Sequence, residues 1–335
     1  MKKVLVLSLL ALALVLNVNA AQQKREIPVY GNYHGDFSEW ESPIRAQVVA
    51  DGGDNYHAVF YSPDENGVEK RYVINGKKQK NVTRFEGDVE VGGDYGTCHV
   101  SGEIVNGIFE GTVKFRDSQD TFRLERVELK PPTLGAEPPE GALVLLGMNP
   151  QENQKLLYEN FTVQPRWVVH NDGSVSISGS SIISKQEYSD AKIHIEFMTP
   201  YMPYERGQAR GNSGVYIIGR YELQVLDSFG EPPRDNEAGG FYQVAVPKVN
   251  AALPPQEWQT YDITFRAPKF ENGQKTENAR VTVVYNGITI HDDLVLPKNT
   301  PGGVSNQEAE SGPLLLQDHS DQVRYRNVWI QKLDE

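Results

Sequence analysis

The sequence predicts an all-β protein, a jelly-roll sandwich of two sheets preceded by a small antiparallel β domain. Three observations support this prediction. Short strand-like runs follow one another along most of the chain, clusters of Gly, Pro, Asn and Asp separate them, and helical periodicity is nearly absent. About a dozen such runs after residue 142 are typical of a sandwich with one concave face, across which ligands commonly lie.

Residues 1–20 have the pattern of an export signal. Lys2 and Lys3 precede an apolar run, Val4–Leu16, which is too short to span a bilayer, and the small residue Ala20 suits signal peptidase. No later stretch is long and apolar enough to cross a membrane. We therefore expect an exported protein, periplasmic or secreted, without a membrane span in the mature chain.

Residues 25–130 are expected to form the small β domain. Asn75-Gly76 and Asn106-Gly107 lie between strand-like runs and predict two tight hairpins. This part of the sequence shows no metal-ligand spacing and no nucleophile with a base beside it, so a docking or stabilising role is expected. A second carbohydrate-contacting surface that uses Tyr30, Tyr33, Trp40 and Tyr56 is the alternative.

A proline-rich linker, residues 131–141, separates this domain from residues 142–335. Its four prolines prevent regular strand pairing. Beyond the linker, Asn286-Gly287 predicts another hairpin, Gln151–Asn160 predicts a short helix, and Ser189–Ala191 is a weaker helix candidate.

Composition excludes several classes of partner. The net charge is −12 and the pI is about 5.2, which argues against nucleic acid or an anionic membrane as the main partner. Cys98 is the only cysteine, so no disulfide forms within the chain, and its place in a strand-like run predicts a buried thiol.

The stretch Gly211–Gly230 carries the clearest site pattern. Two strand-like runs flank Gly219-Arg220, which predicts a tight turn. In the second run Tyr221, Leu223 and Val225 alternate with Glu222 and Gln224, so the apolar side chains face a core and the polar ones face the opposite side. Asp227 follows the run, and a bulge after Gln224 would turn its carboxylate to the Glu222 side.

Several segments match one family in order and spacing. They are Asn212–Tyr216, Tyr221–Asp227, Glu257–Tyr261, Val284–Gly287, Leu316–His319 and Arg324–Val328. Together they resemble the signature of the 3-keto-disaccharide hydrolase family, formerly domain of unknown function 1080. The resemblance runs from about residue 143 to 333 and leaves the first domain uncovered. It implies a concanavalin A-like jelly roll and an exported bacterial enzyme acting on sugars whose C3 hydroxyl is a ketone. Ala238–Tyr242 departs from the family pattern at one or two positions, which bears on the particular substrate.

Glu222-x-Gln224-x-x-Asp227 also resembles the E-x-D-x-x-E strand of glycoside hydrolase family 16, the laminarinase-like β-glucanases. In that family the outer glutamates are nucleophile and acid/base. Here Gln224 replaces the middle acid and the shorter Asp227 the last one. A retaining glycosidase needs carboxyl groups roughly 5–5.5 Å apart, so these departures weaken ordinary glucanase chemistry.

A ketone at C3 acidifies the C2 proton, so a base can form an enolate and expel the C1 substituent, after which water adds. This route needs a base, donors to the enolate oxygen and an acid for the leaving group. Glu222 is the expected base and His319 the expected acid or second base. The remaining candidates are Gln224, Asp227 and Asp318 for catalysis, and Asn212, Tyr216, Arg220 and Tyr242 for substrate binding.

A divalent cation bridging Glu222, Asp227, Asp318 or His319 is a further option, since carboxylates and imidazole form a reasonable mixed ligand set. No ligand spacing identifies such a metal. Three functions compete: a 3-keto-glycoside-cleaving enzyme, a carbohydrate-binding module without catalysis on the same face, and a family 16-like β-glucanase. Asp318-His319 capping a loop, and Glu222 with Gln224 on a polar face that binds nothing, are the structural alternatives.

Overall fold

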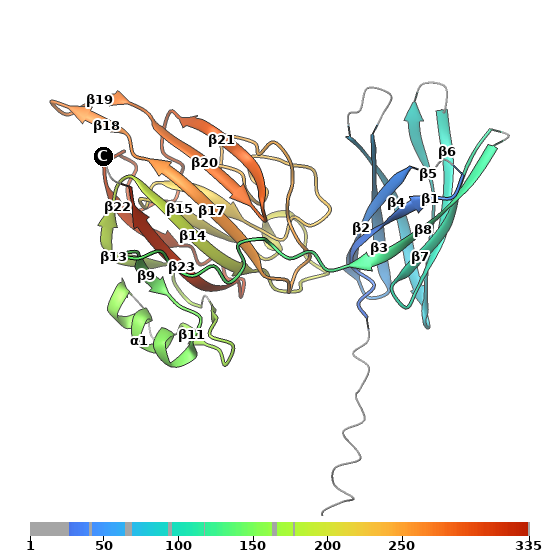
Figure 1. Ribbon diagram of the computed structural model, residues 1–335, viewed down its shortest axis with the longest axis horizontal. Coiled ribbons are helices and arrows are strands. Elements are labelled where there is room, and N and C mark those ends of the chain that lie inside the picture. The colour runs from blue at the N-terminus through green and yellow to red at the C-terminus, as the bar shows by residue number, and fades with distance from the viewer. Residues whose placement is uncertain are drawn as a thin grey trace, which may run out of the picture.

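The chain folds into two β units joined by an extended linker (Figure 1). This computed structural model describes residues 27–39, 42–63, 69–92, 96–116, 118–162, 166–176 and 178–333. Strands dominate the described residues, so the predicted all-β class, a concanavalin A-like jelly roll preceded by a small antiparallel domain, is confirmed. The predicted export signal at residues 1–20 lies outside the described residues. No helix in the described ranges is long and apolar enough to cross a membrane.

The first unit is a closed antiparallel barrel of eight strands in sequence order. Closure comes from β1, a strand that the sequence patterns did not reveal, because it pairs with both β2 and β8. A closed barrel leaves no unpaired sheet edge. Its strands are β1 Gly31–Phe37, β2 Pro43–Gly52, β3 Asn55–Pro63, β4 Glu69–Gln79, β5 Val82–Gly92, β6 Gly96–Val105, β7 Ile108–Phe115 and β8 Ser118–Val127.

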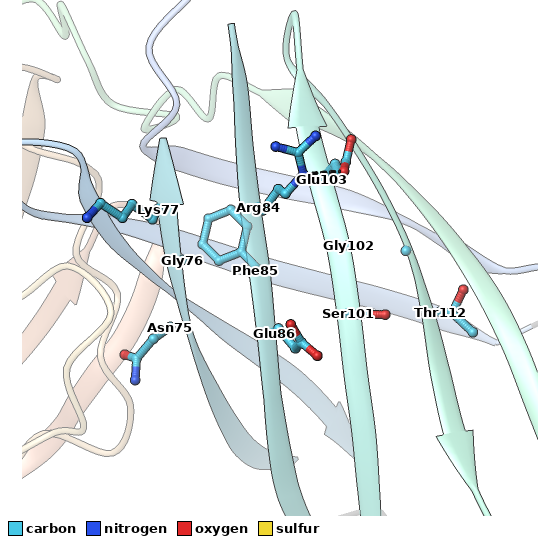
Figure 2. Close-up of a pocket in the computed structure, with 11 residues that line it drawn as sticks. Asn75, Gly76, Lys77, Arg84, Phe85, Glu86, Ser101, Gly102, Glu103 and Thr112 are labelled. Carbon is cyan, nitrogen blue, oxygen red and sulfur yellow. Dashed lines mark hydrogen bonds and ion pairs between the residues drawn. The ribbon is translucent and has the colours of Figure 1, made fainter. Parts of the chain in front are cut away.

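The Asn75-Gly76 hairpin prediction was wrong, because both residues lie inside β4. Gly76 pairs with Phe85 on β5, and a Cβ at position 76 would lie 2.3 Å from the Phe85 ring. Gly102 faces Phe85 from β6, so Figure 2 shows the ring flanked by two glycines. The glycine leaves room for a ring that helps to fill the barrel interior. The Asn106-Gly107 turn, by contrast, is confirmed between β6 and β7, with φ of 51° and 80°.

Aromatic rings fill the barrel. Phe109 lies 5.0 Å from Phe85, 5.5 Å from Phe60 and 5.3 Å from Phe122 between ring centroids. Cys98 is buried in this core, as predicted. Tyr33 is fully buried too, so it is a core residue and not part of a carbohydrate-contacting surface.

The segment that joins the two units, Pro131–Gly141, is attached to the outer face of the sandwich. The Gly135 amide donates to Glu196 Oε1 (2.5 Å), the Thr133 hydroxyl donates to Asp262 (2.6 Å), and the Ala136 carbonyl accepts from Asn327 (2.9 Å). Because the segment has no strand partners of its own, these side chains satisfy backbone groups that would otherwise be unpaired.

The second unit is a sandwich of two antiparallel sheets. One sheet has the order β10-β13-β22-β15-β16, and the other has the order β11-β12-β23-β14-β17-β20-β21, with β9 paired to β23. The strands of the first are β10 Phe161–Thr162, β13 Ile182–Tyr188, β22 Gly312–Leu316, β15 Ser213–Ile217 and β16 Tyr221–Val225. Those of the second are β9 Leu143–Leu146, β11 Val168–Val169, β12 Val175–Ser176, β23 Arg324–Lys332, β14 Ala191–Met198, β17 Gln259–Arg266, β20 Ala279–Tyr285 and β21 Ile288–Leu296. A small ribbon, β18 Lys269–Glu271 with β19 Gln274–Glu277, lies apart from both sheets.

The core lies between the two sheets and includes Tyr221, Leu223 and Val225, as the alternation predicted. The Asn286-Gly287 hairpin between β20 and β21 is also confirmed. The helix α1 Pro150–Asn160 confirms the predicted helix, and Asn149 caps it by accepting from the Gln151 and Glu152 amides. The Ser189–Ala191 helix was wrong, since Ala191 begins β14.

Candidate functional site

The site is built on the hairpin of β15 and β16. Tyr216 pairs with Glu222 and Gly214 with Gln224, on the side of the sheet that faces away from the core. Directly opposed residues of an antiparallel pair have Cβ atoms about 4.5–5.5 Å apart. The hairpin therefore brings a phenol, a carboxyl and an amide together, as the alternation of the second strand predicted for Glu222 and Gln224.

The Glu222 carboxyl is almost covered, with only 4 % of the residue exposed. A Cβ at position 214 would lie 2.4 Å from Glu222 Oε1, so glycine at this position leaves the space that the carboxyl occupies. Burial raises the pKa of Glu222 to about 7, against a hydrogen bond from Tyr216 that lowers it. A carboxyl with this pKa can accept and release a proton near neutral pH.

Gln224 lies beside the carboxyl. With its nitrogen toward Glu222, the amide donates to Glu222 Oε1 (3.2 Å) and to the Ser213 carbonyl (3.1 Å). Its oxygen then faces the Gln208 side-chain amide at 2.9 Å.

Tyr216 and Gln317 complete the polar cluster. The Tyr216 hydroxyl accepts from Gln317 Nε2 (3.3 Å), and its one proton can go to the Pro301 carbonyl (3.0 Å) or to Glu222. Burial, followed by the nearby Glu222 carboxyl, raises the pKa of Tyr216 well above its usual range, so the phenol keeps its proton. Gln317 follows β22, and the backbone amide of Gln317 donates to the Gly214 carbonyl (2.9 Å). The segment Leu316–His319 thus contacts the site through Gln317.

Residues 297–311 form a covering loop beside Glu222. Thr300 Oγ1 accepts from the Glu222 amide (2.8 Å), and the Val304 amide donates to the Gly219 carbonyl (2.8 Å). Arg220 holds the same loop, because its guanidinium donates to the Gln307 carbonyl (2.7 Å) and the Ser311 carbonyl (3.3 Å). We assign Arg220 to fixing this loop rather than to the sugar contact expected from the sequence.

Asp227 is paired elsewhere. The register of β15 with β16 runs without a shift and ends at Val225, so Asp227 lies beyond the paired residues. Asp227 Oδ2 instead lies 2.8 Å from Arg210 Nε, and both side chains are buried. Burial raises the pKa of Asp227, against the Arg210 charge that lowers it. This carboxyl serves an internal ion pair, not a second catalytic position across from Glu222.

The Asp318-His319 pair lies in the turn after β22. Asp318 Oδ1 accepts from the Ser320 amide (2.8 Å), which is the loop-capping role weighed as the structural alternative. His319 is exposed and lies near Asp321. Burial raises the pKa of Asp321, against the hydrogen bond from the Asn212 amide and the nearby His319, which lower it. Asp321 in turn accepts from the Asn212 amide (2.7 Å). The pair therefore lies in the turn between β22 and β23, which touches the residue before β15 through Asp321.

The other predicted binding residues lie at the margin of the cluster. Asn212 donates its side-chain amide to the Gln208 carbonyl (2.8 Å). The Tyr242 amide approaches the Glu222 carbonyl (3.4 Å), and its half-buried ring lies near enough to Tyr216 to raise the pKa of that phenol. Both help to frame the site.

Sequence reasoning missed Gln208, Thr300, Gln317 and Asp321. Gln317 could have been predicted from alternation. Leu314 and Leu316 face the core, so the next residue, Gln317, faces the opposite side, where Glu222 lies. Gln208 and Thr300 lie in loops without periodicity, so nothing in the local pattern marks them. Among the residues that the structure describes, no group of three or more His, Cys, Asp or Glu side chains is arranged to hold a metal ion.

A concave surface lies on the barrel, between β4 and β7 (Figure 2). Its exposed side chains include an ion pair, Arg84 Nε with Glu103 Oε1 at 2.7 Å. It is a polar groove without a buried titratable group, so the catalytic candidates remain those of the sandwich. The residues that line it are Asn75, Gly76, Lys77, Arg84, Phe85, Glu86, Ser101, Gly102, Glu103, Gly111 and Thr112.

The fold and the site together define a jelly-roll protein of the carbohydrate-active, glycoside hydrolase type. Residues 149–331 match the family profile of the 3-keto-alpha-glucoside-1,2-lyase-like domain, and the chain belongs to this family. The resemblance found in the sequence motifs is thereby confirmed.

One solved structure supports this assignment. A predicted glycosyl hydrolase from Parabacteroides distasonis, solved at 2.13 Å, is 31 % identical, with a TM-score of 0.51 over 58 % of this chain and 84 % of that chain. A second one from the same organism, solved at 1.70 Å, is 21 % identical, with a TM-score of 0.36 over 50 % of this chain and 84 % of that chain. No curated protein matches the chain.

Proposed function

We propose that this protein is an exported enzyme that cleaves 3-keto-glycosides by elimination followed by hydration. The observation that carries the proposal is the Glu222 carboxyl, buried beside Gln224 and Tyr216 with a pKa of about 7. Family membership supports the substrate class, and the export pattern of residues 1–20 supports the location.

In the proposed first step, Glu222 removes the proton at C2 of the 3-keto-sugar. The C–H electron pair forms the enolate, whose negative charge gathers on the C3 oxygen. The amide of Gln224 and the phenol of Tyr216 are donors beside the base, and they would stabilise that oxygen. Because the carboxyl has lost most of its hydration, its ionised form is a stronger base than an exposed glutamate.

In the second step the enolate re-forms its carbonyl and the C1–oxygen bond breaks. The leaving alcohol takes up a proton, for which protonated Glu222 or His319 is the proposed donor. Water then adds across the C1–C2 double bond, with its proton going to C2 and its hydroxyl to C1, and the free 3-keto-sugar results. This route needs one buried base and no matched pair of carboxyls, which agrees with the pairing of Asp227 to Arg210.

Substrate can reach the carboxyl only when the cover over it moves, because Glu222 and Gln224 are 4 % and 2 % exposed. The covering loop, residues 297–311, lies against the hairpin through Thr300 and Val304. We propose that opening of this loop precedes binding, as with other active-site loops that exclude water from the reaction.

The test is incubation of the purified protein with 3-keto-trehalose and with methyl 3-keto-glucoside, with detection of released 3-keto-glucose. The wild type should release it, and Glu222→Gln should release none, while Arg84→Gln on the barrel serves as a matched surface control. Saturable binding without turnover would replace the proposal with a carbohydrate-binding module. Release of reducing ends from unmodified β-glucan would point instead to a glucanase.

A further inference from the structure

Two tyrosines of the sandwich lie against the barrel at the junction of the two units. Tyr201 and Tyr204 belong to the junction segment, residues 199–212, which connects β14 to β15. Tyr201 stacks on Tyr30, with ring centroids 5.0 Å apart and an interplanar angle of 22°. Tyr56 of the barrel lies close to the same ring. Four aromatic side chains from both units therefore gather at one place.

The Tyr204 ring is fixed but open to solvent. It lies over Gly52, where an added Cβ would come within 2.5 Å of the ring, and its hydroxyl is near Gly53. Even so, 75 % of Tyr204 and 39 % of Tyr201 remain exposed. Gly52 and Gly53 carry no side chain, so the Tyr204 ring packs against their backbone on one side. The other face of the ring stays open to a ligand.

The charges around these rings cancel one another. Asp51 accepts from Arg206 (2.8 Å) and contacts His57 Nδ1 (2.7 Å). On the other side Arg126 lies 3.5 Å from Glu257. A surface of aromatic rings among paired charges suits a neutral ligand with hydroxyl groups better than an ion, and ligand sites occur preferentially at domain interfaces.

The junction segment also reaches the Glu222 site. Four residues after Tyr204, the Gln208 side-chain amide lies 2.9 Å from that of Gln224 and within hydrogen-bond distance of Asn212. Four extended residues span at most about 14 Å, so the tyrosines lie within reach of a ligand only two or three rings long. One end of the segment thus borders the proposed base, and the other presents the aromatic face.

We infer that Tyr201 and Tyr204, with the barrel behind them, bind the leaving-group ring of the glycoside, the part beyond C1. This inference rests on the proposed function, in which the keto-sugar ring lies at Glu222. It gives the barrel a role in substrate choice: glycosides with a second ring gain a stacking contact, and those with a small leaving group do not.

The experiment compares kcat/KM for 3-keto-trehalose, which carries a second sugar ring, with that for methyl 3-keto-glucoside. Tyr204→Ala should lower kcat/KM about tenfold for 3-keto-trehalose, through KM, and less than twofold for the methyl glycoside. Tyr204→Phe keeps the ring and should restore the wild-type value. Tyr158→Ala, which removes a 57 % exposed tyrosine from α1, is the matched control and should change neither value.

Calorimetric titration with unoxidised trehalose separates this inference from the proposed function. Binding that is present in the wild type and lost in Tyr204→Ala supports the tyrosine site even if no keto-glycoside is cleaved. Turnover with equal effects of Tyr204→Ala on both substrates, or with no effect on either, overturns the inference and leaves the proposed function intact. Absence of both trehalose binding and turnover counts against both.

Discussion

The Glu222 carboxyl lies on the bare backbone of Gly214, since a methyl group there would come within 2.4 Å of Oε1. The glycine of the Asn212-Ser213-Gly214 motif is therefore explained by a side chain on the neighbouring strand. A glycine inside a strand often marks such a close approach.

Gly214→Ala should displace the carboxyl and lower kcat/KM on 3-keto-trehalose at least tenfold, because the base moves from its place beside Gln224. The backbone at Gly214 is not in the left-handed region, so alanine is compatible with the strand itself. A thermal melt run in parallel should show a folded protein. Wild-type activity in a folded Gly214→Ala variant would contradict the placement of the base.

The rate should depend on the ionisation of Glu222. With a pKa of about 7, kcat/KM for the wild type should rise about tenfold per pH unit below 7 and level off above it, because only the carboxylate accepts the C2 proton. A pH–rate profile from pH 5 to 9 checks this. A profile that levels off already at pH 5 would remove Glu222 from the role of base.

Ionisation of Glu222, which the reaction needs, should lower the stability of the folded protein. The folded-state pKa of about 7 lies above the usual value of 4.5, so the folded protein holds this proton more tightly, and ionisation of Glu222 destabilises it as pH rises from 4.5 through 7. The penalty above pH 7 is about 3 kcal/mol. Glu222→Gln should therefore be more stable than the wild type at pH 8 by about that amount, and equal to it near pH 4.5. Urea unfolding at the two pH values measures the difference.

Asp227 should matter for folding more than for chemistry. Its ion pair with Arg210 is buried, and removing one partner of a buried pair costs about 3–5 kcal/mol, because an unpaired charge remains. We expect Asp227→Asn to lose this much in urea unfolding, while its folded fraction keeps kcat within a few-fold. The double variant Arg210→Met/Asp227→Leu should recover most of the loss. A fully stable but inactive Asp227→Asn would favour the family 16-like reaction instead.

Gly76 should be intolerant of a side chain in spite of its place in an Asn-Gly dipeptide. A Cβ at this position meets the Phe85 ring at 2.3 Å, and overpacking of a core typically costs about 1–3 kcal/mol. Gly76→Ala should lower the melting temperature, and Phe85→Leu in the same chain should restore part of it. Asn75→Ala, at the exposed neighbouring position, is the control and should leave the melting temperature unchanged.

Strand alternation predicted the parts of the site that depend on local geometry. Side chains on a strand alternate between faces, so Glu222 and Gln224 had to lie opposite the core residues Leu223 and Val225. The turns at Asn106-Gly107 and Asn286-Gly287 were also predicted from local geometry, because a tight hairpin turn needs two adjacent residues with positive φ and Asn-Gly adopts them readily. At Asn75-Gly76 the same dipeptide misled, because packing inside the barrel decided the conformation.

The sequence by itself determined the two β units, the linker and the face on which the carboxyl lies, because each depends on composition or on a period of two residues. Only the tertiary structure decided which distant groups meet that carboxyl. Loop residues such as Thr300 and Gln208 carry no periodicity, and the choice of Arg210 as the partner of Asp227 depends on burial of both charges. Closure of the barrel by β1 and the meeting of Tyr30 with Tyr201 depend on contacts between residues far apart in the chain, which local pattern does not encode.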